Sequence, residues 1–269
     1  MRKRLIWALL ATVLGLPSST VFAVEFVAHR ALYKLVLEKA RTGSGVSGVT
    51  GRMAVEWQDS CSGWTFEYHS VIDVEFAETK SIRLISTATS WESNDGENYR
   101  FSVRHKTDGK EVERIEGVAK ASAGAIGHVE FSRPKARRLI LPRGTLFPIA
   151  HSLSVLRTAA KEKAPAFLSQ TVFDGMDVTG LYQVNAAIGR VGKTGGAARI
   201  QSKELKTTPS WHVSLGYFGM KSRKSEPNHE IKMRLYANGV ADDMLMDFDE
   251  FIIRGRLDKL DLTPNPNCP

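Results

Sequence analysis

The sequence predicts an all-β fold, an antiparallel meander of strands that carries one main helix. Three observations lead to this prediction. Apolar and polar residues alternate with a period of two along much of the chain, Asn-Gly and Asp-Gly pairs separate these runs, and a single stretch has helical periodicity instead. Because each strand is apolar on one side only, the sheet has to bury that side against itself or against another layer.

The strand pattern is clearest from Trp64 to Phe76, where the even positions are mostly apolar and the odd positions mostly polar. The same alternation recurs at 53–57, 99–103, 211–217, 231–235 and 244–248. Turn signals lie between these runs at 59–63, 94–96, 108–109, 174–175 and 238–239. Asn-Gly and Asp-Gly supply the positive φ angles of tight hairpins, so consecutive strands are expected to be antiparallel neighbours. Two glycine-rich stretches, 43–51 and 189–196, are interpreted as mobile loops.

The helical stretch runs from Leu146 to Ala164, with apolar residues at helical spacing and basic residues toward its end. Thr145 can cap its start, Pro148 is tolerated in the first turn, and Pro165 stops it. We expect this lone helix to cover the open end or a face of the sheet.

The first 23 residues have the pattern of a secretory signal. Three basic residues precede an apolar run from Leu5 to Leu16, and Val21-Phe22-Ala23 offers small residues at a cleavage site after Ala23. Pro17 interrupts the run before it reaches membrane-spanning length, and no other stretch is long or apolar enough to cross a bilayer. The prediction is a signal peptide at 1–23 and a single soluble domain at 24–269, located in the periplasm.

The charge of the predicted mature chain excludes some partners. Residues 24–269 hold 34 Lys and Arg against 29 Asp and Glu, a mild excess that favours contact with anionic lipid headgroups or cell-wall polymers. Local basic groups occur at 135–143 and 221–224. Nucleic-acid binding requires a denser basic surface with exposed aromatic residues, and a cytoplasmic location, so no nucleic-acid partner is expected.

The chain has only two cysteines, Cys61 and Cys268, and both follow the predicted signal. In an oxidising compartment one intramolecular disulfide is the simplest outcome, while an intermolecular bridge or two free thiols are the alternatives. Neither cysteine has another cysteine or a histidine at metal-ligand spacing, so no metal site is predicted.

Catalytic and cofactor motifs are weak. Residues 43–48 match G-x-G-x-x-G, but a strand follows them where a dinucleotide-binding fold needs a helix. The seven histidines show no H-x-H or H-E-x-x-H spacing, and no G-x-S-x-G elbow is present. An acidic cluster at 242–250 lacks the glycine of a calcium loop and is interpreted as a solvated strand face. We therefore predict no catalytic, cofactor-binding or metal residues. A catalytic triad assembled in space from residues far apart in the sequence stays open as the alternative.

Aromatic residues on the predicted strands are the candidate binding residues. They either fill a core or, in a strongly curved sheet, line a concave apolar groove for a lipid or an acyl chain, with the helix as a lid. The candidates for lining such a groove are Trp57, Trp64, Phe66, Tyr68 and Phe76.

Several motifs make the chain resemble the EipB family of periplasmic cell-envelope integrity proteins. These motifs are 29–33 at the predicted mature start, Cys61 in a turn, 141–148 with His151 after it, 173–175, and Cys268 beside the end of the sequence. The resemblance implies an antiparallel β-spiral, an open, twisted, barrel-like meander with one main helix, similar in outline to periplasmic lipoprotein carriers. It also implies a disulfide between Cys61 and Cys268, and a role in keeping the envelope intact under stress. No catalytic residues come with it.

The sequence therefore favours a periplasmic protein that is not an enzyme and carries no cofactor. It would maintain envelope integrity by binding an envelope protein, a lipid or a cell-wall component. Two alternatives stay open: a lipid or lipoprotein carrier with an apolar groove, and an envelope hydrolase.

Overall fold

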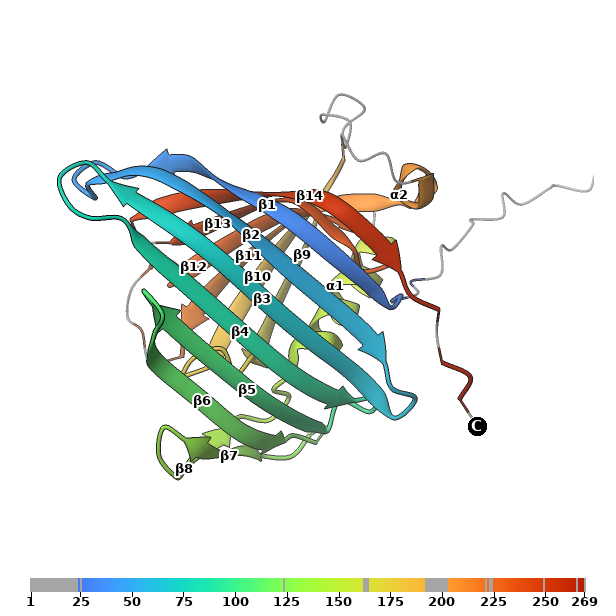
Figure 1. Ribbon diagram of the computed structural model, residues 1–269. Helices are drawn as coiled ribbons and strands as arrows, with labels where there is room; N and C mark the ends of the chain where they lie inside the picture. The colour runs from blue at the N-terminus through green and yellow to red at the C-terminus, as the bar shows by residue number, and fades with distance from the viewer. Residues whose placement is uncertain are drawn as a thin grey trace, which may run out of the picture.

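The computed structural model describes residues 24, 26–122, 124–161, 165–191, 203–220, 222, 225–248, 250–264 and 266–268 (Figure 1). The predicted signal segment 1–23, with its cleavage site after Ala23, lies outside this part of the chain, as does 192–196 of the second predicted loop. The described residues form a 14-stranded antiparallel sheet and two helices, α1 (Pro148–Lys161) and α2 (Lys203–Thr207). The all-β prediction is confirmed. The strands are β1 (His29–Ala40), β2 (Val46–Asp59), β3 (Gly63–Phe76), β4 (Ile82–Ser93), β5 (Asn98–Thr107), β6 (Lys110–Lys120), β7 (Gly127–Arg133), β8 (Arg137–Leu141), β9 (Ala166–Phe173), β10 (Leu181–Arg190), β11 (Ser210–Gly219), β12 (His229–Tyr236), β13 (Ala241–Phe248) and β14 (Phe251–Leu262).

The sheet consists of two arms that meet where β1 pairs with β14. One arm continues from β1 to β8 and the other from β14 back to β9, so β8 and β9 are the two edges of the sheet. The arms curl toward each other and enclose α1 (Figure 1). No backbone ladder joins β8 to β9 among the described residues, so the structure is an open spiral, as predicted.

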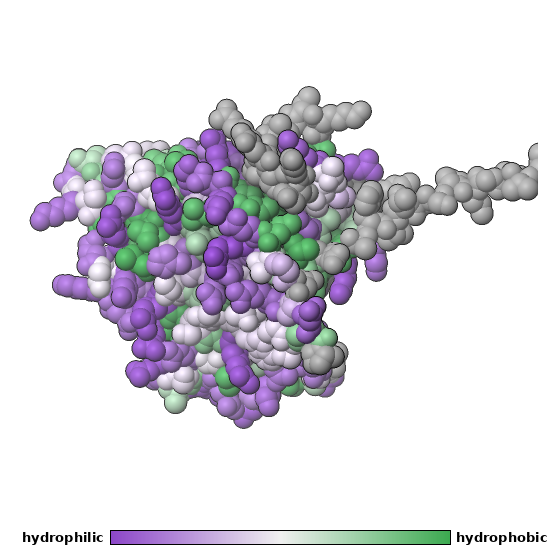
Figure 2. Space-filling view, turned by 45° about the vertical axis from the view of Figure 1, so that its right-hand side comes forward, coloured by the Kyte–Doolittle hydropathy of each residue, from purple (hydrophilic) through white to green (hydrophobic). Residues whose placement is uncertain are grey.

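The alternation read from the sequence separates an inner side of the sheet from an outer side. Inward positions such as Tyr33, Val103 and Ile188 are at most 2% exposed, and they pack in three apolar clusters that follow the curl. Helix α1 contributes Val155 and Leu156 to the cluster that faces β9–β11. The surface in Figure 2 is mostly hydrophilic, with separate hydrophobic patches.

Aromatic rings fill the gap between the two edges of the sheet. Phe147 and Phe173 have no exposed surface, and Phe101 packs edge-on against Phe173 at 5.4 Å and against Phe131 at 5.7 Å between ring centroids. Tyr99 stacks on Phe147 at 5.1 Å. Each aromatic pair contributes roughly 0.5–1.5 kcal/mol of stability beyond the burial of its area. Aromatic packing therefore stabilises the region between β8 and β9, which we call the seam.

The residues before α1 also bridge the seam. The amide of Leu146 donates to the Thr171 carbonyl at 2.9 Å, and the Phe173 amide donates to the Leu146 carbonyl at 3.0 Å, which makes a short parallel bridge to the end of β9. On the β8 side, the Arg137 guanidinium donates to the Val178 carbonyl. The seam is therefore closed by one short bridge and by side chains.

The predicted glycine-rich loop at 43–51 is wrong from Val46 onward, because strand β2 begins there. Of the second predicted loop, 189–196, Gly189 and Arg190 belong to β10, while 192–196 lie outside the described residues. Within β2, a Cβ atom on Gly51 would lie 2.4 Å from the Val71 carbonyl oxygen of β3. The glycine therefore permits close approach of neighbouring strands, a role that its composition alone does not distinguish from that of a loop glycine.

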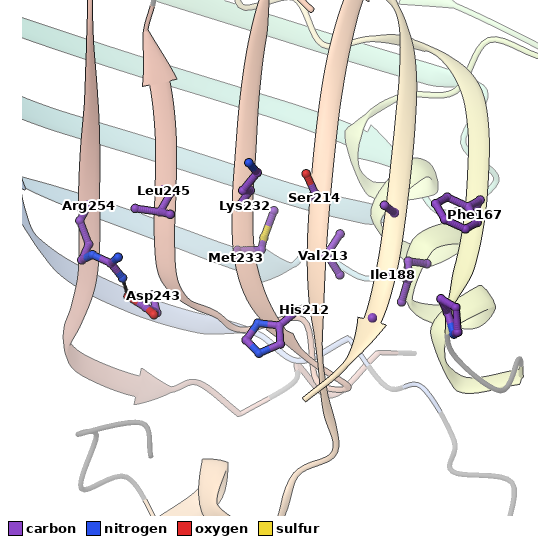
Figure 3. A pocket seen from close by; sticks show the side chains of 13 residues that line it. Phe167, Ile188, His212, Val213, Ser214, Lys232, Met233, Asp243, Leu245 and Arg254 are labelled. Atoms are coloured by element: carbon purple, nitrogen blue, oxygen red, sulfur yellow. Dashed lines mark hydrogen bonds and ion pairs between the residues drawn. The ribbon is translucent and has the colours of Figure 1, made fainter. Parts of the chain in front are cut away.

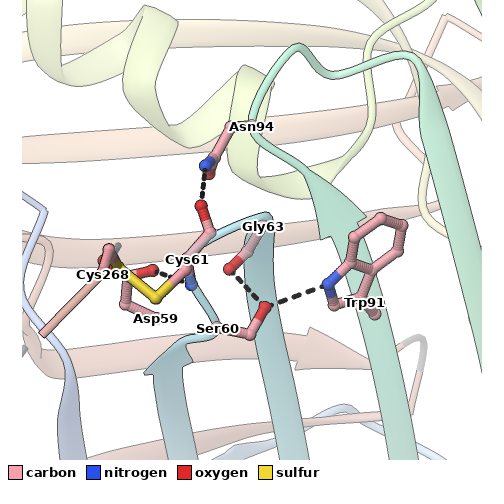
Figure 4. The surroundings of a disulfide bond; sticks show 7 residues. All are labelled: Asp59, Ser60, Cys61, Gly63, Trp91, Asn94 and Cys268. Carbon is pink, nitrogen blue, oxygen red and sulfur yellow. Dashed lines mark hydrogen bonds between the residues drawn. A yellow bond between two sulfur atoms is a disulfide. The ribbon is translucent and has the colours of Figure 1, made fainter. Parts of the chain in front are cut away.

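A disulfide joins Cys61, in the β2–β3 turn, to Cys268, with the Cα atoms 5.5 Å apart and a sequence separation of 207 (Figure 4). Cys61 has a φ of 65°, and its backbone amide donates to Asp59 Oδ1 at 2.8 Å. The bond attaches the segment after β14 to the opposite arm of the sheet.

Replacing Cys61 or Cys268 by Ser should lower the thermal unfolding temperature by similar amounts, and the double variant should lose no more than either single one. In the chain-entropy account a loop of this length contributes on the order of 5 kcal/mol, and that contribution disappears with the first cysteine. Thermal unfolding followed by circular dichroism measures this. Additive losses in the double variant would show that the two sulfurs act separately.

Candidate functional site

The predicted groove-lining residues all lie on β2 and β3, and the structure divides them between two clusters. Trp57 and Trp64 pack edge-on against Phe26, with centroids 5.3 and 4.9 Å apart, and Phe66 lies 4.3 Å from Trp57. Phe26 is 8% exposed, so this segment before β1 fills the space beside the tryptophans. Phe26 was not among the predicted residues because it stands outside any alternating run. The other two predicted residues, Tyr68 and Phe76, pack on the cluster beneath β1, β2, β13 and β14.

A cleft of about 340 Å³ lies between α1 and the ends of β3, β4 and β9, and we call it the α1 cleft. Trp64 and Leu153 give it an apolar wall, while Glu92, Arg157 and Gln170 supply polar groups. The Gln170 amide nitrogen donates to Ser154 Oγ at 3.0 Å, but its buried Oε1 has no partner among the described residues. A buried amide oxygen without a partner favours a site for a water molecule or a ligand donor.

Glu92 attaches the start of α1 to β4. Its side chain is buried, with the residue 2% exposed, and its two carboxylate oxygens accept hydrogen bonds from the Ile149 amide at 2.7 Å and the Ala150 amide at 2.8 Å. These amides belong to the first turn of α1, where backbone donors lack partners within the helix. Burial raises the pKa of Glu92 to about 7, although the two amide donors oppose that shift.

The predicted helix cap was therefore wrong. Thr145 Oγ1 donates to the Pro142 carbonyl at 2.8 Å, within the turn before α1, and Glu92 caps the helix in its place. The cap comes from 57 residues upstream, so no local sequence pattern could reveal it. The helix begins at Pro148 in place of the expected Leu146, because Leu146 is engaged in the bridge to β9.

The turn after Glu92 is also tied to the disulfide (Figure 4). The Asn94 side-chain amide donates to the Cys61 carbonyl at 2.7 Å, and the Asn94 backbone amide donates to the Ser62 carbonyl at 3.1 Å. The disulfide, the β4–β5 turn and the start of α1 thus form one connected structure beside the α1 cleft.

A second depression, of about 490 Å³, lies on the outer side of β9–β14, with strands of the opposite arm and α1 behind it (Figure 3). Its walls combine apolar Phe167 and Leu245 with charged Lys232, Asp243 and Arg254. Arg254 bonds to Glu38 at 2.7 Å and to Asp243 at 2.5 Å, so two carboxylates balance its charge. The sequence predicts no site at this depression, and the paired charges leave Arg254 poorly suited to bind an anion.

A serine and a histidine lie close enough to bear on the hydrolase alternative. Ser86 Oγ lies 2.9 Å from His105 Nδ1, between β4 and β5. Within the described chain no carboxylate is hydrogen-bonded to His105, so a third member of a triad is missing there. The described residues contain no group of three or more His, Cys, Asp or Glu side chains placed to hold a metal ion. In the same part of the chain, no helix has the length and apolar character to cross a membrane.

The pH dependence of stability should change in a Glu92→Gln variant. The folded protein keeps a proton on Glu92 between its ordinary pKa of 4.5 and about 7, whereas the unfolded chain releases it. The free energy of unfolding therefore falls as pH rises through this window, with Glu92 accounting for on the order of 3 kcal/mol.

Urea unfolding at several pH values between these limits measures this contribution. Asp174, whose pKa burial also raises to about 7, continues to titrate in the variant and serves as the internal reference. The wild-type protein should lose more stability with rising pH than the Glu92→Gln variant. Equal losses would mean that Glu92 is already ionised in the folded protein.

Comparisons with known proteins agree with this architecture. A family model described as EipB-like matches residues 21–264. The cell envelope integrity protein EipB of Brucella abortus (strain 2308) is 33% identical over 250 residues, which cover 91% of this chain and 87% of that protein. The crystal structure of a β-barrel-like protein of a domain of unknown function, also from Brucella abortus, aligns with a TM-score of 0.79 at 32% identity, covering 90% of this chain and all of the other. On this evidence the chain belongs to the EipB-like family.

Proposed function

We propose that this protein supports the integrity of a bacterial cell envelope from the periplasm, and that it does so by binding and not by catalysis. Residues 1–23 direct its export, and residues 24–269 form the single working domain. The observation that carries the proposal is the similarity to the Brucella protein named for cell envelope integrity, which extends over 91% of the chain. The partner is an envelope protein, a lipid or a cell-wall component, and the Cys61–Cys268 disulfide stabilises the binding form.

The described side chains support binding better than hydrolysis. The Ser86–His105 pair has no carboxylate partner in the described chain, whereas the α1 cleft combines an aromatic wall, an unpartnered amide oxygen and the cation of Arg157. An apolar wall with a few polar groups is the usual composition of a ligand site.

Deleting the gene from its native bacterium should make the cells more sensitive to detergents and to cell-wall-active antibiotics. Expression of the full chain should restore resistance, while a version without residues 1–23 should fail because it stays in the cytoplasm. Survival on graded detergent plates measures both. Immunoblots of each strain control for expression. A deletion strain as resistant as the parent would refute the envelope role.

A carrier that shuttles an acyl chain is the second candidate, and the α1 cleft is the observation that favours it. Protein purified from a periplasmic extract should then carry lipid, which native mass spectrometry detects as an added mass. A Leu153→Arg variant, which places a charge on the apolar wall of the cleft, should lose that added mass. The control variant Arg52→Glu, on the outer side of β2, should keep it. A spectrum with the bare chain mass alone would exclude the carrier.

A further inference from the structure

Positive charge is concentrated on the β5–β8 end of the sheet. Residues 98–143 contain eleven Lys and Arg against five Asp and Glu, a net charge of +6. Residues 24–269 as a whole carry +5, so the remainder of that range has a net charge of −1. The mild overall excess therefore comes from this one segment, the green strands at the bottom of Figure 1.

These cations point away from the interior. The inward positions of β5–β8 are filled by buried apolar residues such as Tyr99, Ile115, Val129 and Leu141. Since side chains alternate along a strand, Arg100, Lys120 and Arg138 project from the outer side or from the strand ends, and all three are exposed.

Most of these cations also lack acidic partners. On other strands several outer cations are paired, as in Arg30–Glu56 at 2.7 Å and Arg83–Asp73 at 2.7 Å. Within 98–143 only Arg104 and Arg114 pair with a carboxylate in the described chain. The other cations in this segment, with no carboxylate within 4 Å among the residues described, are Arg100, Lys106, Lys110, Lys120, Arg133, Lys135, Arg137, Arg138 and Arg143.

Exposed apolar side chains alternate with the unpaired cations. Across the strands, Arg100 lies opposite Val118, and Lys120 lies in the same row as His128 and Ile140. Val118 is 44% exposed and Ile140 57%. We call this surface the basic face and define it by Arg100, Val118, Lys120, Arg138 and Ile140.

One carboxylate lies among these side chains. Glu130 of β7 is opposite Val118 on one side and Arg138 on the other, and its Oε1 is 3.5 Å from His128 Nε2. The basic face therefore sets three cations against this single acidic group, and its net charge stays positive.

We propose that the basic face docks on the surface of an anionic phospholipid bilayer. Each cation near such a surface gains about 1 kcal/mol, or roughly a fivefold increase in partitioning, and exposed apolar side chains enter the boundary between headgroups and acyl chains. A soluble anionic polymer would reward the cations but not Val118 and Ile140, so the interleaving favours a bilayer. The proposal rests on the periplasmic location proposed above, and it identifies lipid headgroups as one binding partner.

Co-sedimentation of the full mature chain with vesicles tests this proposal. Binding is expected to phosphatidylethanolamine vesicles that contain phosphatidylglycerol, weakening as salt rises, and not to phosphatidylcholine vesicles. The double variant Lys120→Glu, Arg138→Glu should bind at least about tenfold more weakly. The matched control, Lys39→Glu with Arg52→Glu on exposed positions of β1 and β2, changes the net charge equally and should bind like the wild type. Thermal unfolding of each variant verifies that it is folded.

A further variant distinguishes docking on a bilayer from attraction to anionic charge alone. Ile140→Ser should weaken vesicle binding without changing binding to soluble dextran sulfate. If Ile140→Ser has no effect on vesicle binding, or if both double variants lose binding equally, the basic face is not a bilayer-docking surface. Because this assay uses purified protein, it can fail while the deletion strain still shows an envelope defect, and the reverse also holds.

Discussion

A single sheet that is apolar on one side has to bury that side against itself, and the rest of this structure follows from that constraint. In the described part of the chain, fourteen strands follow one continuous antiparallel order and have no second sheet to pack on. The arms therefore curl, and α1 fills the space that the curl leaves, with Leu156 and Val155 buried in the cluster it shares with β9–β11. Three apolar clusters occupy much of the interior. Surfaces that remain open to partners include the α1 cleft, the outer depression and the basic face.

The second consequence of this architecture is a seam between β8 and β9. In a closed barrel, hydrogen bonds pair the backbone groups of every strand edge. Here the two edges are joined by packed aromatic side chains and by the short bridge at Leu146. Gly175 has a φ of +68°, and a Cβ there would lie 2.8 Å from the Phe101 ring, so the turn after β9 fits the seam only as glycine. Its Asp174 carbonyl accepts a hydrogen bond from the Tyr99 hydroxyl at 2.8 Å. The motifs at 141–148 and 173–175 thus lie at the seam between β8 and β9.

The fold was predictable from the sequence where local pattern decides it. Alternation predicted the strands, and Asn-Gly and Asp-Gly predicted hairpins such as that at Asp108, which has a φ of 49°. Long-range contacts were beyond such patterns. The Glu92 cap joins residues 57 positions apart, and Phe26 meets Trp57 and Trp64 only after the sheet has curled. The basic residues of 98–143 stand in the sequence, but which of them lie apart from the described carboxylates depends on the cross-strand register, and a single sequence does not specify that register.

The end of β4 lies between two of these surfaces, the basic face and the α1 cleft. Neighbouring residues of a strand point to opposite sides of the sheet, so Trp91 faces outward beneath Arg100, whose guanidinium lies 5.4 Å from its ring, while Glu92 faces inward to α1. The indole of Trp91 donates to Ser60 Oγ at 3.1 Å, one residue before Cys61. The disulfide thus holds a turn that contacts both sides of the sheet. The disulfide therefore lies in a turn that also contacts Trp91, beside the basic face, and Asn94, which lines the α1 cleft.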